Sequence, residues 1–203
     1  MIYLTDIFQG LCDYLNEKLR WTEARSRFTK AVFDYFSDLL EANYRHRSLK
    51  EERNYLTIDY IWRYETSSKH YIVLAIEHEN KSDVDEFLNK EVQHLIDIEA
   101  ENKIAITYPP LGEEGELIEK VREKIRRCGK KLRTLEDYLI VFGFSTSKKV
   151  NGKRRRAILF KGYRIDSTGG IKNRYERVIL QTPRRKGAPS TSNKVSVIIK
   201  TKG

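Results

Sequence analysis

Hydrophobic residues recur every three or four positions in the first fifth of the chain, and polar residues fill the positions between them. This spacing predicts a helix over residues 2–20 and a second helix from Thr22 to about Tyr44, each with one apolar face. The charged residues 46–53 predict a connection that ends this helical part of the chain.

The pattern then changes to one that is typical of β-strands. Residues 55–64 are rich in aromatic and β-branched side chains, which favour strands. Residues 70–76 form a nearly continuous apolar run, as expected of a central strand that is covered on both faces. Further along, the pattern predicts helices over residues 84–99 and 113–128, and strands over residues 103–108 and 137–144.

Beyond residue 144 the pattern predicts strands alone. Asn151 and Gly152 lie between two strand-like segments, residues 148–150 and 154–163, and predict a two-residue hairpin turn. The last predicted elements are a strand over residues 174–180, a loop rich in Pro, Ser and basic residues over 181–193, and a strand over 194–200.

This order of elements predicts an α/β fold in which helices flank a mixed central sheet. We expect residues 1–144 to form the α/β core with its N-terminal helices, and residues 145–203 to form a basic, β-rich extension packed on that core. The two cysteines, Cys12 and Cys128, form no metal-ligand or disulfide pattern, which is typical of proteins in a reducing compartment.

Charge divides the chain into two unequal parts. From Lys148 to the end, the sequence holds 17 Lys and Arg residues against two acidic residues, whereas the remainder holds 22 basic and 27 acidic residues. A polyanion is the natural partner of such a basic segment, because each Lys or Arg that contacts a phosphate releases a condensed counterion. We expect DNA, with RNA as the alternative. No long apolar run and no signal peptide is visible, so we expect no membrane partner and a cytoplasmic location.

The basic residues that we expect to contact nucleic acid fall into two groups. One flanks the predicted hairpin turn, where six of the nine residues from 148 to 156 are basic, and the other lies in the loop that follows. The first group is Lys148, Lys149, Lys153, Arg154, Arg155 and Arg156, and the second is Arg184, Arg185 and Lys186. The alternative for the first group is a solvated edge hairpin whose charges prevent association between strands.

Acidic side chains interrupt two of the predicted strands. Asp59 lies within the aromatic strand, and Glu77 and Glu79 end the most hydrophobic strand, on the same face as Lys81. Carboxylates at the end of a buried strand repel one another and are costly to desolvate, and a bound divalent cation relieves both costs. Mg²⁺ prefers such oxygen ligands. The alternative is an ordinary polar exit of the strand into solvent.

Zinc is disfavoured as the metal. His78 and His94 could bind it beside Glu79, but no Cys accompanies them and no His-Glu-x-x-His spacing occurs. A hydrogen-bonded role is the simpler interpretation of each histidine.

The carboxylate pattern resembles that of the PD-(D/E)XK nuclease superfamily, in which an Asp on one strand and a (D/E)-x-K on the next converge on Mg²⁺. The matching residues are Asp59 and the run Glu77-His78-Glu79, which gives E-x-E, and some members of the family replace the Lys with Glu. A frame one step later, Glu79-Asn80-Lys81, restores E-x-K. The resemblance covers residues 22–108. The family has a strand before the one that bears the Asp, where this sequence has the charged residues 46–53, and no Pro precedes Asp59.

Residues on the helices match other features of the family. Gln93 matches a Gln that the family often carries on the helix after the second of these strands. Lys90, about one turn earlier, matches members in which the Lys has moved to this helix. An acid of the first helix sometimes joins the metal site, and either Glu23 or Glu41 could match it.

The resemblance implies a restriction-endonuclease-like core and a nuclease that hydrolyses phosphodiester bonds of DNA. Asp59, Glu77 and Glu79 would hold Mg²⁺ or Mn²⁺, and Lys81 or Lys90 would orient the attacking water. The alternatives are a non-catalytic DNA-binding or architectural protein and an RNA-processing factor, both using the same basic residues. A homodimer is compatible with this interpretation, because many such nucleases cut both strands as two-fold pairs.

Composition adds a hint about the source. Lys, Arg and Glu are abundant, whereas only three Gln and one Met occur, which is typical of proteins from hot environments. The size, charge and composition are also similar to those of small nuclease-fold proteins of viruses that infect hyperthermophilic archaea.

Overall fold

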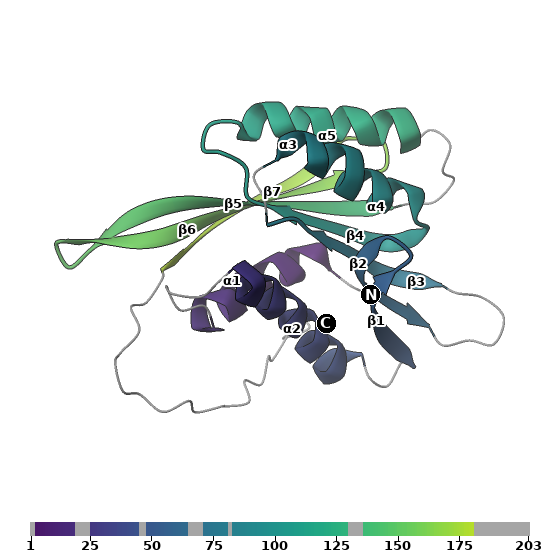
Figure 1. Cartoon of the computed structure of the whole chain (residues 1–203), viewed down its shortest axis with the longest axis horizontal. Helices are drawn as coiled ribbons and strands as arrows, with labels where there is room; N and C mark the ends of the chain where they lie inside the picture. Colours follow the sequence, from purple (N-terminus) through teal and green to yellow (C-terminus); the bar gives the residue numbers. More distant parts are fainter. Residues whose placement is uncertain are drawn as a thin grey trace.

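One mixed sheet organises the part of the chain that the computed structural model describes, which is residues 3–18, 25–44, 48–64, 71–80, 83–129 and 136–180. Its seven strands lie in the same order in space as in the sequence (Figure 1). They are β1 (Leu49–Tyr55), β2 (Ile58–Tyr64), β3 (Ile72–His78), β4 (Ala100–Thr107), β5 (Asp137–Val150), β6 (Lys153–Asp166) and β7 (Ile171–Leu180). Strands β3, β4 and β5 are parallel to one another, and every other neighbouring pair is antiparallel.

Helices cover both faces of this sheet, as Figure 1 shows. The helices α1 (Leu4–Lys18) and α2 (Arg25–Asn43) pack on one face, where Phe8, Phe36 and Trp62 belong to one buried cluster. The opposite face carries α3 (Val84–Glu86), the π-helix η2 (Phe87–Val92), α4 (Gln93–Asp97) and α5 (Glu114–Gly129), over a second buried cluster. The prediction of an α/β fold with a mixed sheet between helices is therefore confirmed.

The parallel direction of β3, β4 and β5 determines which strand ends lie together at one edge of the sheet. Parallel neighbours need a crossover connection, and the segment from α3 to α4 and the helix α5 provide the two crossovers. The carboxyl ends of β3, β4 and β5 consequently share one edge of the sheet. Because β2 runs antiparallel to β3, the start of β2 lies at this same edge.

The first strand corrects one prediction. Residues 46–53 were expected to be a connection, and 55–64 a single strand, but β1 covers Leu49–Tyr55 and a two-residue turn leads into β2. Its polar composition suits an edge strand, which charged side chains protect from further pairing. The turn was missed because it contains no Gly: Leu56 takes a positive φ of 55° instead, which few non-glycine residues adopt.

The hairpin of β5 and β6 agrees with the sequence prediction. Asn151 and Gly152 form its turn with φ values of 49° and 77°, as a type I′ turn requires. Both strands are longer than expected, and residue 145 lies within β5. The loop over residues 181–193 and the strand over 194–200 lie outside the described residues. No helix in the described ranges has the length and apolar character that crossing a membrane requires.

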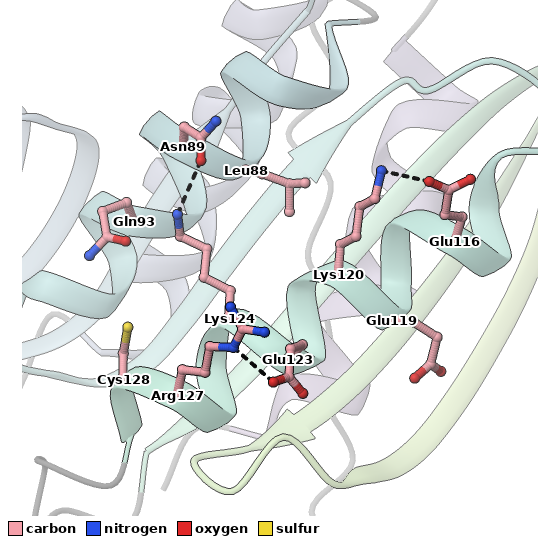
Figure 2. A pocket seen from close by; sticks show the side chains of 10 residues that line it. All are labelled: Leu88, Asn89, Gln93, Glu116, Glu119, Lys120, Glu123, Lys124, Arg127 and Cys128. Atoms are coloured by element: carbon pink, nitrogen blue, oxygen red, sulfur yellow. Dashed lines mark hydrogen bonds and ion pairs between the residues drawn. The ribbon is translucent and has the colours of Figure 1, made fainter.

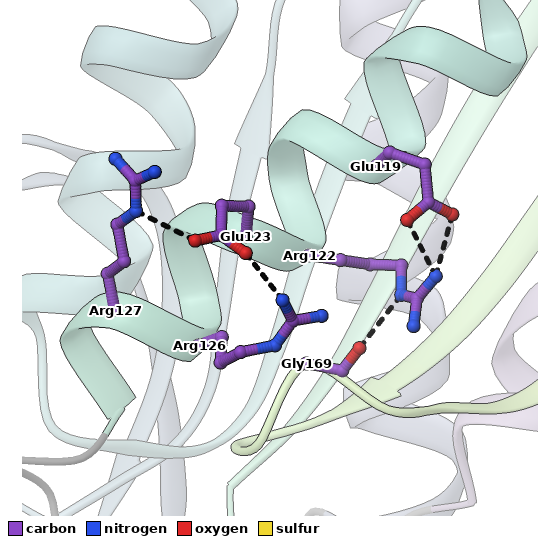
Figure 3. Close-up of polar contacts among 6 residues, drawn as sticks. All are labelled: Glu119, Arg122, Glu123, Arg126, Arg127 and Gly169. Atoms are coloured by element: carbon purple, nitrogen blue, oxygen red, sulfur yellow. Dashed lines mark hydrogen bonds and ion pairs between the residues drawn. The ribbon is translucent and has the colours of Figure 1, made fainter.

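Balanced charges cover the outer surface of α5. Figure 3 shows that Glu123 pairs with Arg126 and Arg127, and that Glu119 pairs with Arg122. Arg122 also donates to the carbonyl oxygen of Gly169 at 2.9 Å, which joins α5 to the turn between β6 and β7. The three arginines of this helix therefore have acidic partners on the helix itself.

A buried ion pair lies under the second helical layer. The Lys103 ammonium donates to Oε2 of Glu136 at 2.6 Å, and the two side chains are 0% and 1% exposed. The hydroxyl of Tyr138 donates to the same Glu136 oxygen at 3.0 Å. Burial lowers the pKa of Lys103, and the bond to Glu136 opposes that shift. The two charges therefore stabilise each other, and Glu136 is the main partner that favours the charged form of Lys103.

We predict that Glu136→Ala lowers the free energy of unfolding by about 3–5 kcal/mol, because it leaves a buried ammonium without its counter-ion. The double variant Lys103→Met with Glu136→Leu should recover most of that loss, because it removes both charges. Chemical denaturation measures each value. A loss below about 1 kcal/mol for Glu136→Ala, the size expected for a surface pair, would contradict the burial of the pair.

Candidate metal centre and nucleic-acid interface

Asp59 and Glu77 are neighbours across β2 and β3. The register that pairs Tyr60 with Ile76 puts them opposite each other. The backbone N–H of Asp59 lies 3.4 Å from Oε2 of Glu77, and Oδ2 of Asp59 accepts from the backbone N–H of His78 at 2.9 Å. The structure therefore brings together these two of the sequence-predicted carboxylates. Glu77 is 1% exposed, although it lies near the end of its strand.

Two residues of the crossover helices complete this group. Glu91 of η2 is buried, and Nδ1 of His94 lies 3.1 Å from Oε1 of Glu77. One ligand atom from each of Glu77, Glu91 and His94 lies within 4.8 Å of the others. We call these three residues the Glu77 cluster, with Asp59 beside it. Sequence analysis did not single out Glu91, and it considered His94 only in connection with zinc.

Local helix geometry explains how Glu91 and His94 reach the sheet. They are three residues apart, a spacing that places two side chains on one face of a helix. Glu91 lies in the last turn of η2 and His94 in the first turn of α4. A π-helical turn contains an extra residue, which re-aims the side chains that follow it, and such turns occur often at functional sites. The apolar neighbours Val92 and Leu95 are buried and hold the segment against the sheet.

The electrostatics of the cluster favour a cation. Burial, hydrogen bonding to Glu91 and the charges of Asp59 and Glu91 all raise the pKa of Glu77. A divalent ion would supply the missing positive charge. Ligand atoms about 2.1 Å from a shared octahedral ion lie roughly 3–4 Å apart, and the 3.1 Å between His94 and Glu77 fits this range. The residues present therefore fit a divalent metal.

Glu79 and the other predicted strand residues lie apart from the cluster or outside the described residues. Glu79 is half-buried just after β3, and its backbone N–H donates to the carbonyl of Ile106 at 2.9 Å. It is not a member of the Glu77 cluster. Lys81 and Glu23 are outside the described residues. Glu41 is exposed on α2, the helix that covers the opposite face of the sheet.

Lys90 lies beside the Glu77 cluster, whereas Gln93 lines a separate groove. Nζ of Lys90 lies 3.7 Å from Oε1 of Glu91, and the Lys90 side chain is 55% exposed. It therefore lies at the rim of the cluster. Gln93 instead lines a groove between the crossover helices and α5 (Figure 2). Its amide donates to Oδ1 of Asp97 at 2.8 Å.

His78 belongs to the aromatic core on the other side of the sheet. Its ring stacks on Phe28 and meets Phe33 and Tyr108 edge to face. Nε2 lies 3.0 Å from the hydroxyl of Tyr108, and burial lowers the pKa of His78 to about 3. The imidazole is therefore neutral at physiological pH, and it takes no part in the Glu77 cluster.

The basic hairpin projects beyond the helical layers (Figure 1). We call residues 145–156 the β5–β6 ribbon. All of its side chains are exposed except that of Val150, which is half-buried. Lys148, Lys149, Lys153 and Arg155 form no ion pair with a carboxylate in the described part of the chain, and Arg154 donates to Oγ of Ser147 at 2.8 Å. The predicted contacts Arg184, Arg185 and Lys186 lie outside the described residues.

Comparison with protein-family models and with curated protein sequences gives no match for this chain. Its site must therefore be interpreted from its own residues.

We predict that Glu77→Gln stabilises the metal-free protein above pH 5. Because the folded-state pKa of Glu77 lies above its ordinary value of 4.5, folding takes up a proton. The associated stability is complete below pH 4.5 and declines by about 1.4 kcal/mol per pH unit as the pH rises. An amide of the same shape avoids this cost, so the variant should exceed the wild type by about 2–3 kcal/mol at pH 7. Chemical denaturation in EDTA at several pH values measures the difference.

The matched control is Glu116→Gln, which changes an exposed carboxylate on α5. Its effect should be small and independent of pH above 5, because that carboxylate is solvated in both states. A Glu77→Gln variant less stable than the wild type at pH 7 in EDTA would show that the carboxylate is well compensated without a metal.

Proposed function

We propose that this protein is a divalent-metal-dependent nuclease that hydrolyses phosphodiester bonds of DNA. The observation that carries the proposal is the convergence of Glu77, Glu91 and His94 beside Asp59, where burial and the neighbouring negative charges raise the pKa of Glu77. A buried carboxyl whose pKa is raised by burial and by neighbouring charges, as that of Glu77 is, is a recognised mark of a functional site.

The order of the elements supports a restriction-endonuclease-like core. The sequence resemblance called for a strand before the one that bears Asp59, and β1 now provides it. From α2 to β4 the chain runs helix, three antiparallel strands, crossover helices and a parallel strand. We propose that this segment is the PD-(D/E)XK-like core, and that the β5–β6 ribbon is its basic extension.

Mg²⁺ or Mn²⁺ is the proposed cofactor. Asp59, Glu77 and Glu91 offer oxygen ligands, which suit both ions, and His94 offers a nitrogen. Imidazole is a better ligand for transition metals than for Mg²⁺, so the presence of His94 favours Mn²⁺. When bound, the cation lowers the pKa of a coordinated water and stabilises charge on the scissile phosphate.

The residues of the chain have separate roles in this proposal. Glu77 from the sheet and Glu91 from the helix η2 would hold the ion together with His94. Asp59 is fixed by the backbone N–H of His78, so its second oxygen can face the ion or a water. Lys90 at the rim is placed to contact a phosphate oxygen or orient the attacking water. Glu79 and Lys81, which follow Glu77 closely in the sequence, stay as proposed contributors to the site.

The ribbon extends from the same edge of the sheet as the cluster. Glu77 pairs with Ala105, and Ala105 pairs with Ile140, so Glu77 and Ile140 lie at one level across the sheet. Along β5 the turn begins about ten residues later, which corresponds to about 33 Å. A helical turn of DNA is about 34 Å long. A phosphate backbone held by the ribbon can therefore reach the cluster within one turn.

We predict that Asp59→Asn and Glu77→Gln each abolish metal-dependent cleavage of DNA while leaving DNA affinity in EDTA unchanged. Substitution of residues that hydrogen-bond to metal ligands typically lowers metal affinity or activity by roughly 10–100-fold. Loss of a direct metal ligand should reduce the cleavage rate by more than this. Cleavage of labelled linear, branched and single-stranded DNA with Mg²⁺ and Mn²⁺ measures the rate, and fluorescence anisotropy measures affinity.

Glu116→Gln again serves as the control and should cleave like the wild type. Loss of activity in Glu77→Gln cannot be assigned to unfolding, because that variant is expected to be the more stable protein. Wild-type cleavage by both site variants would overturn the proposed site. A wild-type protein that binds DNA but cuts none of the substrates with either ion would favour a non-catalytic DNA-binding protein.

We predict that Mn²⁺ bound to the protein is coordinated by His94. Electron spin echo envelope modulation should show coupling of the Mn²⁺ spin to a directly bound imidazole nitrogen. His94→Gln should remove this coupling and weaken Mn²⁺ binding by at least about tenfold, whereas Gln93→Ala, whose amide faces Asp97, should keep both unchanged. Bound Mn²⁺ with no nitrogen coupling in the wild type would exclude His94 as a ligand.

A further inference from the structure

Cross-strand register divides the six basic side chains of the β5–β6 ribbon between its two faces. Directly paired residues of an antiparallel ladder share a face, and successive residues alternate. Lys149 pairs with Arg154, and Lys148 pairs with Arg155. The first face of the ribbon therefore carries Lys149, Arg154 and Arg156, and the second face carries Lys148, Lys153 and Arg155.

The charges of the ribbon oppose its own folding. Lys148 opposite Arg155, and Lys149 opposite Arg154, are like-charge pairs of the kind that destabilises a hairpin. No acidic residue occurs between 145 and 156. The helix α5 provides the contrast, because Lys120 and the three arginines that Figure 3 shows are paired with acids three or four positions away. Within the described part of the chain, Lys148, Lys149, Lys153 and Arg155 thus lack the acidic partners that most basic residues of α5 have, and they are available to an external polyanion.

Equal charge on both faces indicates two rows of phosphates rather than one. A flat surface or a single strand could contact only one face and would leave three cations on the other without a partner. A groove of double-stranded nucleic acid has a phosphate backbone on each side. The ribbon also lacks an aromatic residue, although base stacking on aromatic side chains is the usual basis of single-strand binding.

The dimensions of the ribbon select the groove. A sheet with its side chains is about 10 Å thick, whereas the major groove of B-form DNA is about 12 Å wide and the minor groove about 6 Å. The strands from residue 145 to the turn span about 20 Å, which exceeds the roughly 8.5 Å depth of the major groove. The major groove of A-form RNA is too narrow and deep for side chains to enter.

We propose that the β5–β6 ribbon inserts into the major groove of double-stranded DNA, with each face against one phosphate backbone. The inference rests on the proposed function only for the choice of DNA as the partner, and it requires no metal. According to this inference, the protein binds DNA in its double-stranded form.

The experiment compares two triple variants, one for each face. Lys149→Gln, Arg154→Gln and Arg156→Gln neutralise the first face, and Lys148→Gln, Lys153→Gln and Arg155→Gln neutralise the second. The control triple, Lys120→Gln, Lys124→Gln and Arg127→Gln on α5, removes the same charge elsewhere. Fluorescence anisotropy of the full chain in EDTA measures binding to a 20-base-pair DNA duplex, the matching RNA duplex and single-stranded DNA, over a range of salt concentrations.

Both ribbon triples should weaken binding to duplex DNA to a similar degree, by about 100-fold at 0.1 M salt, and should lower the slope of log affinity against log salt by about 2.7. The α5 triple should change either value much less. Melting temperatures should stay the same or rise, because each ribbon triple removes like-charge pairs. Loss confined to one face, or equal affinity of the wild type for duplex DNA and either of the other nucleic acids, would overturn the inference.

Blocking one groove at a time tests the groove itself. Duplex DNA that carries glucosylated 5-hydroxymethylcytosine has its major groove filled and should bind at least tenfold more weakly. Duplex occupied by netropsin, which fills the minor groove, should bind normally, and the reverse result would overturn the inference. A protein that binds in this way but never cuts would refute only the nuclease proposal. Metal-dependent cutting by a protein whose ribbon triples bind DNA normally would refute only the ribbon inference.

Discussion

The desolvation of the Glu77 carboxylate is the constraint around which this structure is arranged. Strand β3 is buried along its whole length, because helices cover both faces of the sheet. An acidic residue near its carboxyl end must therefore either emerge into solvent or be compensated inside. Here the side chains of Asp59 and Glu91 add negative charge around Glu77 instead of neutralising it. Among the described residues, Nδ1 of His94 and the backbone N–H of Asp59 are its neighbouring nitrogen groups. Such an arrangement lowers the stability of the metal-free protein, and the proposed metal site would account for it.

Lys103 and Glu136 show that the protein compensates buried charge fully where no ligand is involved. Both side chains are as buried as Glu77, yet they form a direct ion pair that a Tyr hydroxyl completes. The same sheet therefore holds one buried carboxyl with an internal counter-ion, Glu136, and one, Glu77, whose surroundings favour its protonated form. Natural proteins accept such local cost mainly at functional sites, so the difference between the two sites is itself an argument for function at Glu77.

Sequence periodicity predicted the elements whose pattern is local, and failed where tertiary contacts decide. Helices α1, α2 and α5, the buried strand β3 and the Asn151–Gly152 turn follow from spacing and turn chemistry. Strand β1 is polar and depends on pairing with β2, so its own residues gave no signal. Asp59 and Glu77 were found because acids stand out in apolar strands. Glu91 looked like an ordinary polar position in an amphipathic helix, since no local pattern reveals the π-helical turn beside it. The spacing Glu91-x-x-His94, seen beside a buried Glu77, was the one available signal.

The Glu77 cluster is acidic and the β5–β6 ribbon is basic, and both lie at the same edge of the sheet. On the proposed function, a divalent ion at the cluster would supply positive charge at the point where the phosphate backbone approaches the acidic side chains. The β5–β6 ribbon would hold the backbone further along β5 and β6, so it would set the affinity for DNA in the absence of metal. The ion would then matter for engagement at the cluster, and it would belong to the DNA-binding surface as well as to the chemistry.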